Sequence, residues 1–301
     1  MKRFTYLILV ALFLSTSIAQ AQADPWANAE RKPGLVAQIT AKLNEEAWFV
    51  PGGPDAEGKP TVLKARVFRP GTPGPFKVAV ISHGSPAKGS DRPKMAVPSY
   101  RSASEWLVAR GYMVVIPLRR GYGEPGPWIE GFGKCNDADF VSAGRATADD
   151  IEAVARYFRT IPEVRRDRVL LVGVSAGGFG VMASAQRNID GVFALLNFSG
   201  GRGGHQGRNA DMNCSPDQLV EAAGTFGAGA KKPSLWIYAE NDTFFDSELS
   251  QSMTDAFKEA GGNVEYLLMP DFKNEGHSLF GDIDGRSLWA EPVAKFLKKF
   301  E

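Results

Sequence analysis

The chain has 301 residues, of which 44% are hydrophobic and 23% are charged, a composition typical of a globular protein with a large core. Its 35 Lys and Arg residues nearly balance 34 Asp and Glu residues. This balance gives no electrostatic basis for binding nucleic acid or an anionic membrane surface, so neither is an expected partner.

The first 23 residues have the organisation of a secretory signal peptide. Lys2 and Arg3 precede an apolar run over residues 6–14, which is shorter than the roughly 20 residues needed to span a bilayer. Ala21-Gln22-Ala23 matches a cleavage site, and Ala19-Gln20-Ala21 is a second candidate. We therefore expect cleavage rather than a retained anchor, a periplasmic or secreted protein without stable membrane insertion, and one domain over residues 24–301.

From residue 60 onward, short apolar runs alternate with amphipathic ones. Helical spacing of apolar residues occurs over residues 151–158, 249–260 and 293–300. The predicted strands are Val62–Phe68, Phe76–Ser82, Met113–Pro117, Val169–Gly173, Val192–Phe198, Leu235–Ala239 and Val264–Met269. Their continuously apolar character is typical of strands buried on both faces. The alternation predicts an α/β protein: a mostly parallel sheet with helices on both faces.

Two long stretches, residues 119–137 and 199–232, interrupt this alternation and are predicted to be lid-like loops. Both follow predicted strands, so both are expected at the carboxyl edge of the sheet, where ligands bind in open α/β folds. Each contains one of the two cysteines, Cys135 and Cys214. In an oxidising compartment the pair is expected to form a disulfide, the alternative being two free or buried thiols.

Ser175 is the predicted nucleophile. It lies in Gly173-Val174-Ser175-Ala176-Gly177, directly after a predicted strand and before small residues that can begin a helix. Strand, tight turn and helix in this order are the context of a nucleophile elbow, in which the neighbours must be small because the turn is strained. A serine hydroxyl also needs a base to remove its proton.

His277 and Asp242 complete a predicted triad. His277 follows the last predicted strand and is read as the base rather than as a surface histidine. Asp242 follows Leu235–Ala239, so the chain order is Ser, Asp, His; Glu240 and Asp246 are alternative acids.

A His83-Gly84 pair ends another predicted strand, which is where an oxyanion donor is expected. The predicted donors are the backbone amides of Ser85 and Ala176. His83 itself is predicted to be structural, and His205 to be solvated or to face the substrate.

Together, the elbow, the His83-Gly84 turn, the Asp242 loop and Gly276-His277 resemble the α/β-hydrolases, most closely the dienelactone hydrolase-like branch. The resemblance covers roughly residues 60–301 and implies the α/β-hydrolase fold with a Ser, Asp, His triad. Dienelactone hydrolases carry a cysteine nucleophile where this chain has Ser175, which favours general carboxylic-ester hydrolysis.

The segment Arg119-Arg120-Gly121-Tyr122-Gly123 resembles a turn of prolyl-oligopeptidase-type peptidases. Arg119 or Arg120 is a candidate clamp for a substrate carboxylate, the alternative being an internal role holding loop backbone or an acid. Tyr122, Trp128 and Phe132 are candidates for an apolar pocket wall or for loop anchors.

The sequence thus predicts a serine hydrolase that cleaves a small carboxylic ester through an acyl-enzyme. The alternatives are a small serine peptidase and a binding protein that has lost catalysis. No clustered ligand spacing suggests a metal, and neither a metal nor an organic cofactor is expected.

Overall fold

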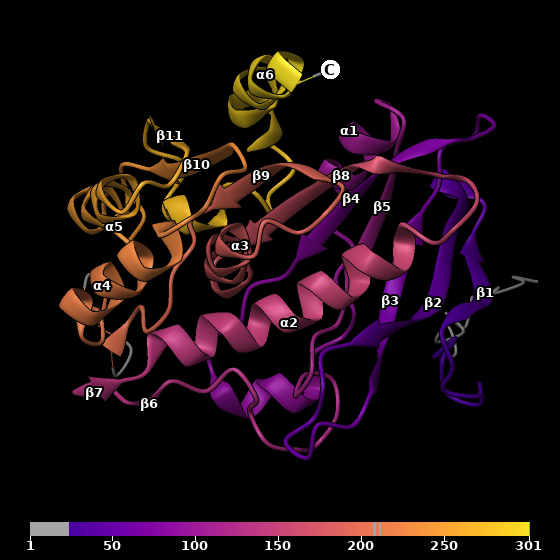
Figure 1. The fold of residues 1–301 in the computed structure, drawn as a ribbon, viewed down its shortest axis with the longest axis horizontal. Helices are drawn as coiled ribbons and strands as arrows, with labels where there is room; N and C mark the ends of the chain where they lie inside the picture. The colour runs from indigo at the N-terminus through magenta and orange to yellow at the C-terminus, as the bar shows by residue number, and fades with distance from the viewer. Residues whose placement is uncertain (1–23, 207–208, 211, 301) are drawn as a thin grey trace, which may run out of the picture.

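The computed structural model describes residues 24–206, 209–210 and 212–300 (Figure 1). The predicted signal peptide lies outside these residues. One sheet has the strand order β1-β2-β3-β5-β4-β8-β9-β10-β11. Its strands are β1 (Gly34–Thr40), β2 (Glu45–Gly52), β3 (Thr61–Phe68), β4 (Phe76–Ser82), β5 (Tyr112–Pro117), β8 (Val164–Val174), β9 (Val192–Phe198), β10 (Ser234–Ala239) and β11 (Val264–Met269).

The strands from β5 to β11 in this order run parallel to their neighbours, whereas β1, β2 and β3 form an antiparallel extension at one end. Every predicted strand lies within one of the observed strands. The carboxyl ends of β4, β8, β10 and β11 therefore meet at one edge of the sheet, which brings the predicted site residues to a common place.

Helices cover both faces of the sheet (Figure 1). They are α1 (Arg101–Val108), α2 (Phe140–Phe158), α3 (Ala176–Gln186), α4 (Pro216–Gly227), α5 (Ser247–Glu259) and α6 (Arg286–Leu297). Side chains of α1 and α6 belong to one buried cluster, and those of α2 to α5 to another on the opposite face. The sheet is therefore buried on both sides, which is why its strands read as continuous apolar runs.

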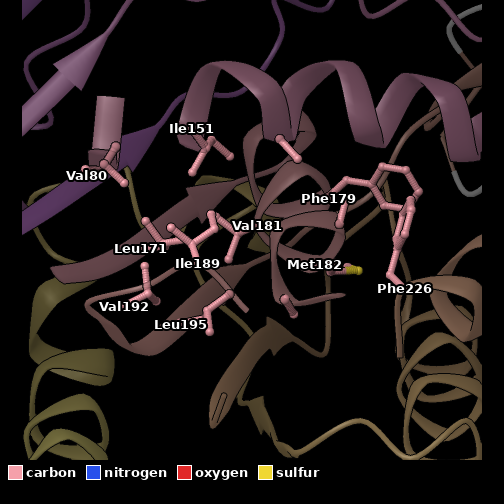
Figure 2. Close-up of a cluster of buried hydrophobic side chains, with 14 of the residues drawn as sticks. Val80, Ile151, Leu171, Phe179, Val181, Met182, Ile189, Val192, Leu195 and Phe226 are labelled. Atoms are coloured by element: carbon pink, nitrogen blue, oxygen red, sulfur yellow. The ribbon is translucent and has the colours of Figure 1, made fainter. Parts of the chain in front are cut away.

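Figure 2 shows part of the larger cluster, where α3 is held between the sheet and its neighbouring helices. Phe179 of α3 packs against Phe226 of α4, with ring centroids 5.3 Å apart, and Leu171 of β8 is buried in the same cluster. This packing fixes the helix that begins directly after Ser175, so the nucleophile candidate rests on a rigid element.

Three regions differ from the sequence interpretation. Residues 24–60, to which no element was assigned, contribute β1 and β2, because Trp48 and Val50 bury their side chains in the larger cluster. The predicted loop 199–232 contains α4, whose apolar residues recur with helical spacing. The predicted loop 119–137 contains β6 (Gly133–Lys134), which pairs with β7 (Asp137–Ala138) in a small hairpin.

Among the residues that the structure describes, no helix has both the length and the apolar character required to cross a membrane.

Candidate active site

Ser175 occupies the sharp turn between β8 and α3. Its backbone has φ 52° and ψ −122°, which places a non-glycine residue in the left-handed half of torsion space. The turn is held by hydrogen bonds from the Ser175 amide to the Phe198 carbonyl, 3.0 Å, and from the Gly201 amide to the Ser175 carbonyl, 3.2 Å. The Ser175 hydroxyl does not cap the helix, and the residue lines a cavity. Such strain at a site residue is typical of catalytic positions.

Small neighbours are required by the way that the turn packs. A Cβ atom on Gly177 would lie 2.1 Å from the Ser82 carbonyl oxygen, and one on Gly173 would lie 2.4 Å from the Gly177 carbonyl oxygen. Both obstacles are backbone atoms, so neither can move aside cheaply. The glycines of the elbow are therefore explained by the close approach of the start of α3 to the backbone of β4, at Gly177, and to that of β8, at Gly173.

The residues that carry the two predicted oxyanion donors, Ser85 and Ala176, both lie close to Ser175. Ala176 is the first residue of α3, where backbone amides lack partners within the helix. Gly84 approaches so closely that a Cβ atom on it would lie 3.1 Å from the Ser175 Cβ, and Ser85 follows it. Ser85 and Ala176 line the same cavity as Ser175. This is the arrangement needed to stabilise an oxyanion formed at a carbonyl attacked by Ser175.

Asp242 and His277 are brought together by the loops after β10 and β11. His277 Nδ1 lies 3.1 Å from each carboxylate oxygen of Asp242. Asp242 Oδ1 also accepts hydrogen bonds from the amides of Phe244 and Phe245, at 2.9 and 3.1 Å, and the carboxylate is buried. A buried acid held in this way can orient an imidazole through Nδ1 and leave Nε2 to act as a base.

The competing acids lie elsewhere. Glu240 is exposed, and Asp246 caps the start of α5 by accepting a hydrogen bond from the Leu249 amide at 2.8 Å. A further carboxylate that the sequence interpretation overlooked, Glu275, accepts a hydrogen bond from the His277 amide at 3.0 Å. Of these acids, Asp242 is therefore the one that meets the His277 ring, while Glu275 holds its backbone.

A cavity of about 440 Å³ opens beside Ser175. Phe244 and Phe245 line it and also contact His277, with ring centroids 4.2 and 5.6 Å from the imidazole. These rings connect the histidine to the space in front of the serine. Within the described part of the chain, no hydrogen bond joins the Ser175 hydroxyl to His277. Such bonds are often long in ligand-free sites and shorten when a substrate binds.

Trp128 and Phe132 also line this cavity, which agrees with a pocket-wall role. Their rings meet edge to face at 5.8 Å. His205 also lines the cavity; its ring stacks on Phe244 at 3.5 Å. The predicted lid loops therefore do provide pocket walls.

Arg119 and Arg120, the candidate clamps for a substrate carboxylate, do not lie where a clamp is expected. The Arg119 guanidinium is buried and donates to Glu130, and that of Arg120 donates to Asp150 with an Nε–Oδ1 distance of 2.6 Å. Neither arginine lines the cavity beside Ser175, and nor does Tyr122. Both arginines thus have the internal role that was the alternative interpretation.

Tyr122 nevertheless connects the buried Arg119–Glu130 pair to the turn that carries Ser85. Its hydroxyl donates to Glu130 Oε2 at 2.9 Å and lies 2.6 Å from Ser85 Oγ. Because the tyrosine proton is used toward Glu130, Ser85 Oγ donates the hydrogen bond to the Tyr122 oxygen. The sequence interpretation missed Glu130 altogether. A buried acid eleven residues after Arg119 is recognisable only when the loop is folded, because the sequence shows no pattern that joins them.

His83 is buried and neutral. Burial, and then the nearby charge of Arg119, lower its pKa to about 3. Its Nδ1 lies 2.8 Å from the Gly84 carbonyl oxygen, and its Nε2 accepts a hydrogen bond from the Arg119 amide at 3.1 Å. His83 thus fixes the turn that carries Ser85, in the structural role expected.

Cys135 and Cys214 form the expected disulfide, with Cα atoms 4.8 Å apart. The Cys214 amide donates to the Gly203 carbonyl at 2.8 Å, and Gly203 lines the cavity. The bond therefore joins the two loops next to a cavity wall. No group of His, Cys, Asp or Glu side chains suited to hold a metal ion occurs among the described residues.

A parallel sheet with a serine elbow after β8, an acid after β10 and a histidine after β11 defines an α/β-hydrolase. Within this class the chain belongs to the Dienelactone hydrolase family, whose profile matches residues 63–285. Membership supports a hydrolase of the ester-cleaving type. No curated protein sequence matches the chain.

Solved structures show the same fold at low sequence identity. A putative dienelactone hydrolase from Klebsiella pneumoniae is 17% identical with a TM-score of 0.53, over 82% of this chain and 96% of the other. An acetyl xylan esterase from Paenibacillus sp. R4 is 16% identical with a TM-score of 0.60, over 90% and 88%. Dipeptidyl peptidase 4 from Porphyromonas gingivalis is 17% identical with a TM-score of 0.61, over 85% of this chain but 36% of the peptidase.

Proposed function

We propose that the protein is a serine hydrolase that cleaves a small carboxylic ester through an acyl-enzyme. The observation that carries the proposal is the pairing of His277 Nδ1 with the buried Asp242 carboxylate in a site whose cavity is lined by Ser175. The catalytic roles are Ser175 as nucleophile, His277 as base and Asp242 as its orienting acid.

In the acylation step, Ser175 Oγ attacks the ester carbonyl carbon while His277 Nε2 takes the hydroxyl proton. The carbonyl oxygen becomes an oxyanion, which accepts hydrogen bonds from the amides of Ser85 and Ala176. When the carbon–oxygen ester bond breaks, His277 gives its proton to the departing alcohol. The buried Asp242 carboxylate stabilises the imidazolium that exists between these two transfers.

In the deacylation step, water attacks the acyl-enzyme carbonyl while His277 takes a proton from that water. The same two amides hold the second oxyanion. Its collapse releases the carboxylic acid and returns the proton to Ser175 Oγ. The cavity of about 440 Å³ is of a size that suits a small ester.

The test is covalent labelling with a fluorophosphonate, followed by mapping of the modified peptide. The expected result is an adduct on Ser175 that is lost in Ser175→Ala and strongly reduced in His277→Ala, with hydrolysis of 4-nitrophenyl acetate lost in parallel. Near-normal hydrolysis by folded Ser175→Ala would overturn the assignment of the nucleophile. Neither labelling nor hydrolysis by the wild type, before and after reduction of the disulfide, would favour a non-catalytic binding protein.

A small serine peptidase is the second candidate, because 85% of this chain shares its fold with 36% of the chain of a solved dipeptidyl peptidase. The two candidates differ in the leaving group. We expect 4-nitrophenyl esters to be cleaved far faster than peptide 4-nitroanilides of the same acyl group. Comparable rates would favour the peptidase.

We also propose that the protein is exported and acts in the periplasm or outside the cell. The signal-peptide pattern of residues 1–23 supports this, as does the Cys135–Cys214 disulfide, since such bonds persist in oxidising compartments. N-terminal sequencing of the protein from a fractionated host is expected to begin at Asp24. Recovery of the full-length chain from the cytoplasmic fraction would contradict export.

A further inference from the structure

Phe244 lies between the rings of two histidines. Its ring is stacked on that of His277, with centroids 4.2 Å apart and planes inclined by 25°, and on that of His205, with centroids 3.5 Å apart and planes inclined by 15°. His205, Phe244 and His277 come from the loops that follow β9, β10 and β11, which are neighbouring strands of the sheet. The stack therefore joins the proposed base to the loop after β9, which forms one wall of the cavity.

A chain of hydrogen bonds connects the same three loops. Glu275 Oε1 accepts hydrogen bonds from the amides of His277, at 3.0 Å, and Thr243, at 3.2 Å, and Oε2 accepts one from the Thr243 hydroxyl. Because that hydroxyl has a single proton, it accepts from His205, whose Nε2 carries the proton of the 2.8 Å hydrogen bond between them. Glu275 thus sets the tautomer of His205 through Thr243, and the ring that packs on Phe244 is held at its edge.

The loop after β9 also contacts Phe244 at two further residues. A Cβ atom on Gly204 would lie 3.0 Å from Phe244 Cδ1 and 3.1 Å from its carbonyl oxygen, so the absence of a side chain allows the loop to approach this closely. The side-chain amide of Asn213 donates to the Phe244 carbonyl oxygen. His205 itself has φ 56°, a left-handed conformation that is uncommon for a residue with a side chain. Three residues of one loop thus hold Phe244 where its ring meets His277.

The face of the Phe244 ring matters because of the charge that His277 carries during the reaction. In the proposed acylation, His277 takes the proton of Ser175 and is an imidazolium until it gives the proton to the departing alcohol. Asp242 meets this cation at its edge, through Nδ1. Phe244 meets its flat face, and the face of an aromatic ring attracts a cation that lies within about 6 Å of the ring centroid. Both neighbours therefore favour the protonated imidazole over the neutral one.

We propose that Phe244 is a positioning residue that stabilises the imidazolium of His277 through the face of its ring, and that the ring of His205 holds Phe244 in that position. The inference rests on the proposed ester hydrolysis at Ser175 and adds a condition to it: the loop after β9 must be docked on Phe244 for the base to work at its full rate. Neither positioning residue takes part in a bond change, because the proton moves from Ser175 Oγ to His277 Nε2 and then to the departing alcohol.

The first experiment compares Phe244→Leu, which removes the aromatic face, with Phe244→Tyr, which keeps it. Phe244→Leu is expected to lower kcat for 4-nitrophenyl acetate roughly 3- to 30-fold and to change KM less than about threefold. Phe244→Tyr should stay within about twofold of the wild type in both constants. The second-order rate of fluorophosphonate labelling at Ser175 should fall with kcat in Phe244→Leu, since labelling depends on the same base.

The pH dependence of kcat/KM separates this role from a merely structural one, because its acid limb reports the protonation of the base in the free enzyme. Without the ring face the imidazolium is less stable, so the acid limb of Phe244→Leu should move to lower pH by about half a unit or more. The titratable groups around His277 remain in this variant, namely Asp242 at Nδ1, Glu275 at the backbone amide and His205 across the stack. A folded but slower Phe244→Leu whose acid limb stays in the wild-type position would show that Phe244 only fills space, which overturns the proposal.

The second experiment tests the loop after β9 through three variants of His205. His205→Ala removes the ring and the hydrogen bond to Thr243, His205→Gln keeps a side-chain N–H donor without the ring, and His205→Phe keeps a ring without the donor. We expect kcat to fall roughly 3- to 10-fold in His205→Ala and His205→Gln and to recover in His205→Phe, because the stack is what holds Phe244. Wild-type kcat in folded His205→Ala, or recovery by Gln but not by Phe, would show that the His205 ring does not have this role.

Trp128→Leu is the matched control, because Trp128 is another aromatic side chain of the same cavity and makes no ring contact with His277 in the described part of the chain. It is expected to change KM more than kcat and to leave the acid limb in place. An equal shift of the acid limb in this control would show that the effect does not come from the ring on His277, and would overturn the proposal. Urea unfolding checks that every variant is folded.

Failure of the proposed function and failure of this inference give different results. A wild type that neither forms a fluorophosphonate adduct on Ser175 nor hydrolyses 4-nitrophenyl acetate contradicts the proposed function. A wild type that does both, together with a Phe244→Leu variant that is labelled at the wild-type rate and has an unmoved acid limb, contradicts the role of Phe244 alone.

Discussion

His277 Nδ1 lies within hydrogen-bond distance of both carboxylate oxygens of Asp242, at 3.1 Å to each. The carboxylate is itself fixed, because the amides of Phe244 and Phe245 donate to its Oδ1. The imidazole is thus held against a buried charge whose position the backbone determines. This relationship distinguishes Asp242 from the other acids that follow β10, and it leads to the first prediction.

Asp242→Asn is expected to lower kcat for ester hydrolysis by roughly 10³-fold or more, because an amide neither stabilises the imidazolium nor selects the useful tautomer of His277. Steady-state kinetics with 4-nitrophenyl acetate measure the effect. The controls are Glu240→Gln and Asp246→Asn. Glu240 is exposed, and Asn caps a helix as well as Asp, so both variants should retain near-normal activity. A larger loss in either control than in Asp242→Asn would show that the acid was assigned wrongly.

Tyr122→Phe is expected to reduce kcat about 5- to 30-fold with little change in KM. The hydroxyl of Tyr122 joins Ser85 Oγ to Glu130, so its removal loosens the turn that carries one oxyanion donor. Glu130 keeps Arg119 and Arg202 as partners, so the protein should remain folded. The assay compares kcat and KM separately for 4-nitrophenyl acetate. A rise in KM alone would place the effect on substrate binding and contradict a positioning role.

Removal of the Cys135–Cys214 bond is expected to lower the free energy of unfolding by about 3–4 kcal/mol, because the bond closes a chain segment of 79 residues. Urea unfolding of Cys135→Ala/Cys214→Ala measures this change. Activity should also fall, since the bond lies next to Gly203 in the cavity wall. Alkylation of the wild-type cysteines without a reductant would show that the thiols are free in the purified protein.

The sequence was sufficient to place the parallel strands and the loops that carry the candidate triad. Strands buried on both faces are continuously apolar, and a strained serine turn demands Gly173 and Gly177. These are local constraints, so they leave a local signal. The pairing of His277 with Asp242 followed from the order of the chain, because residues after neighbouring parallel strands meet at one edge of the sheet.

The cavity walls could not be derived in the same way. Arg202 lies among glycines after β9, and nothing near it in the sequence identifies Glu130 as its partner. Long-range ion pairs decide where the arginines lie: Arg119 and Arg120 pair with Glu130 and Asp150 and are not part of the cavity lining, whereas Arg202, which also pairs with Glu130, belongs to it. The position of Arg202, four residues beyond the end of β9 in the parallel sheet, was the one available signal.

The final prediction concerns stability against pH. The pKa of His83 is lowered from 6.5 to about 3, by burial first and then by the charge of Arg119. Below pH 6.5 the unfolded chain therefore binds a proton at His83 that the folded protein does not bind until about pH 3. The contribution of neutral His83 is fully present above pH 6.5 and is lost progressively as the pH falls toward 3, at about 1.4 kcal/mol per pH unit.

His83→Asn removes this titration while leaving a side-chain amide to donate toward the Gly84 carbonyl that His83 Nδ1 contacts. We expect its free energy of unfolding to be lower than that of the wild type at pH 7, since the bond between Nε2 and the Arg119 amide is lost. Between pH 6 and 4, however, its stability should fall less steeply by about 1.4 kcal/mol per pH unit. Urea unfolding at several pH values measures both slopes. Parallel slopes would mean that His83 takes up its proton in the folded protein, which is incompatible with the buried neutral ring that receives the Arg119 amide.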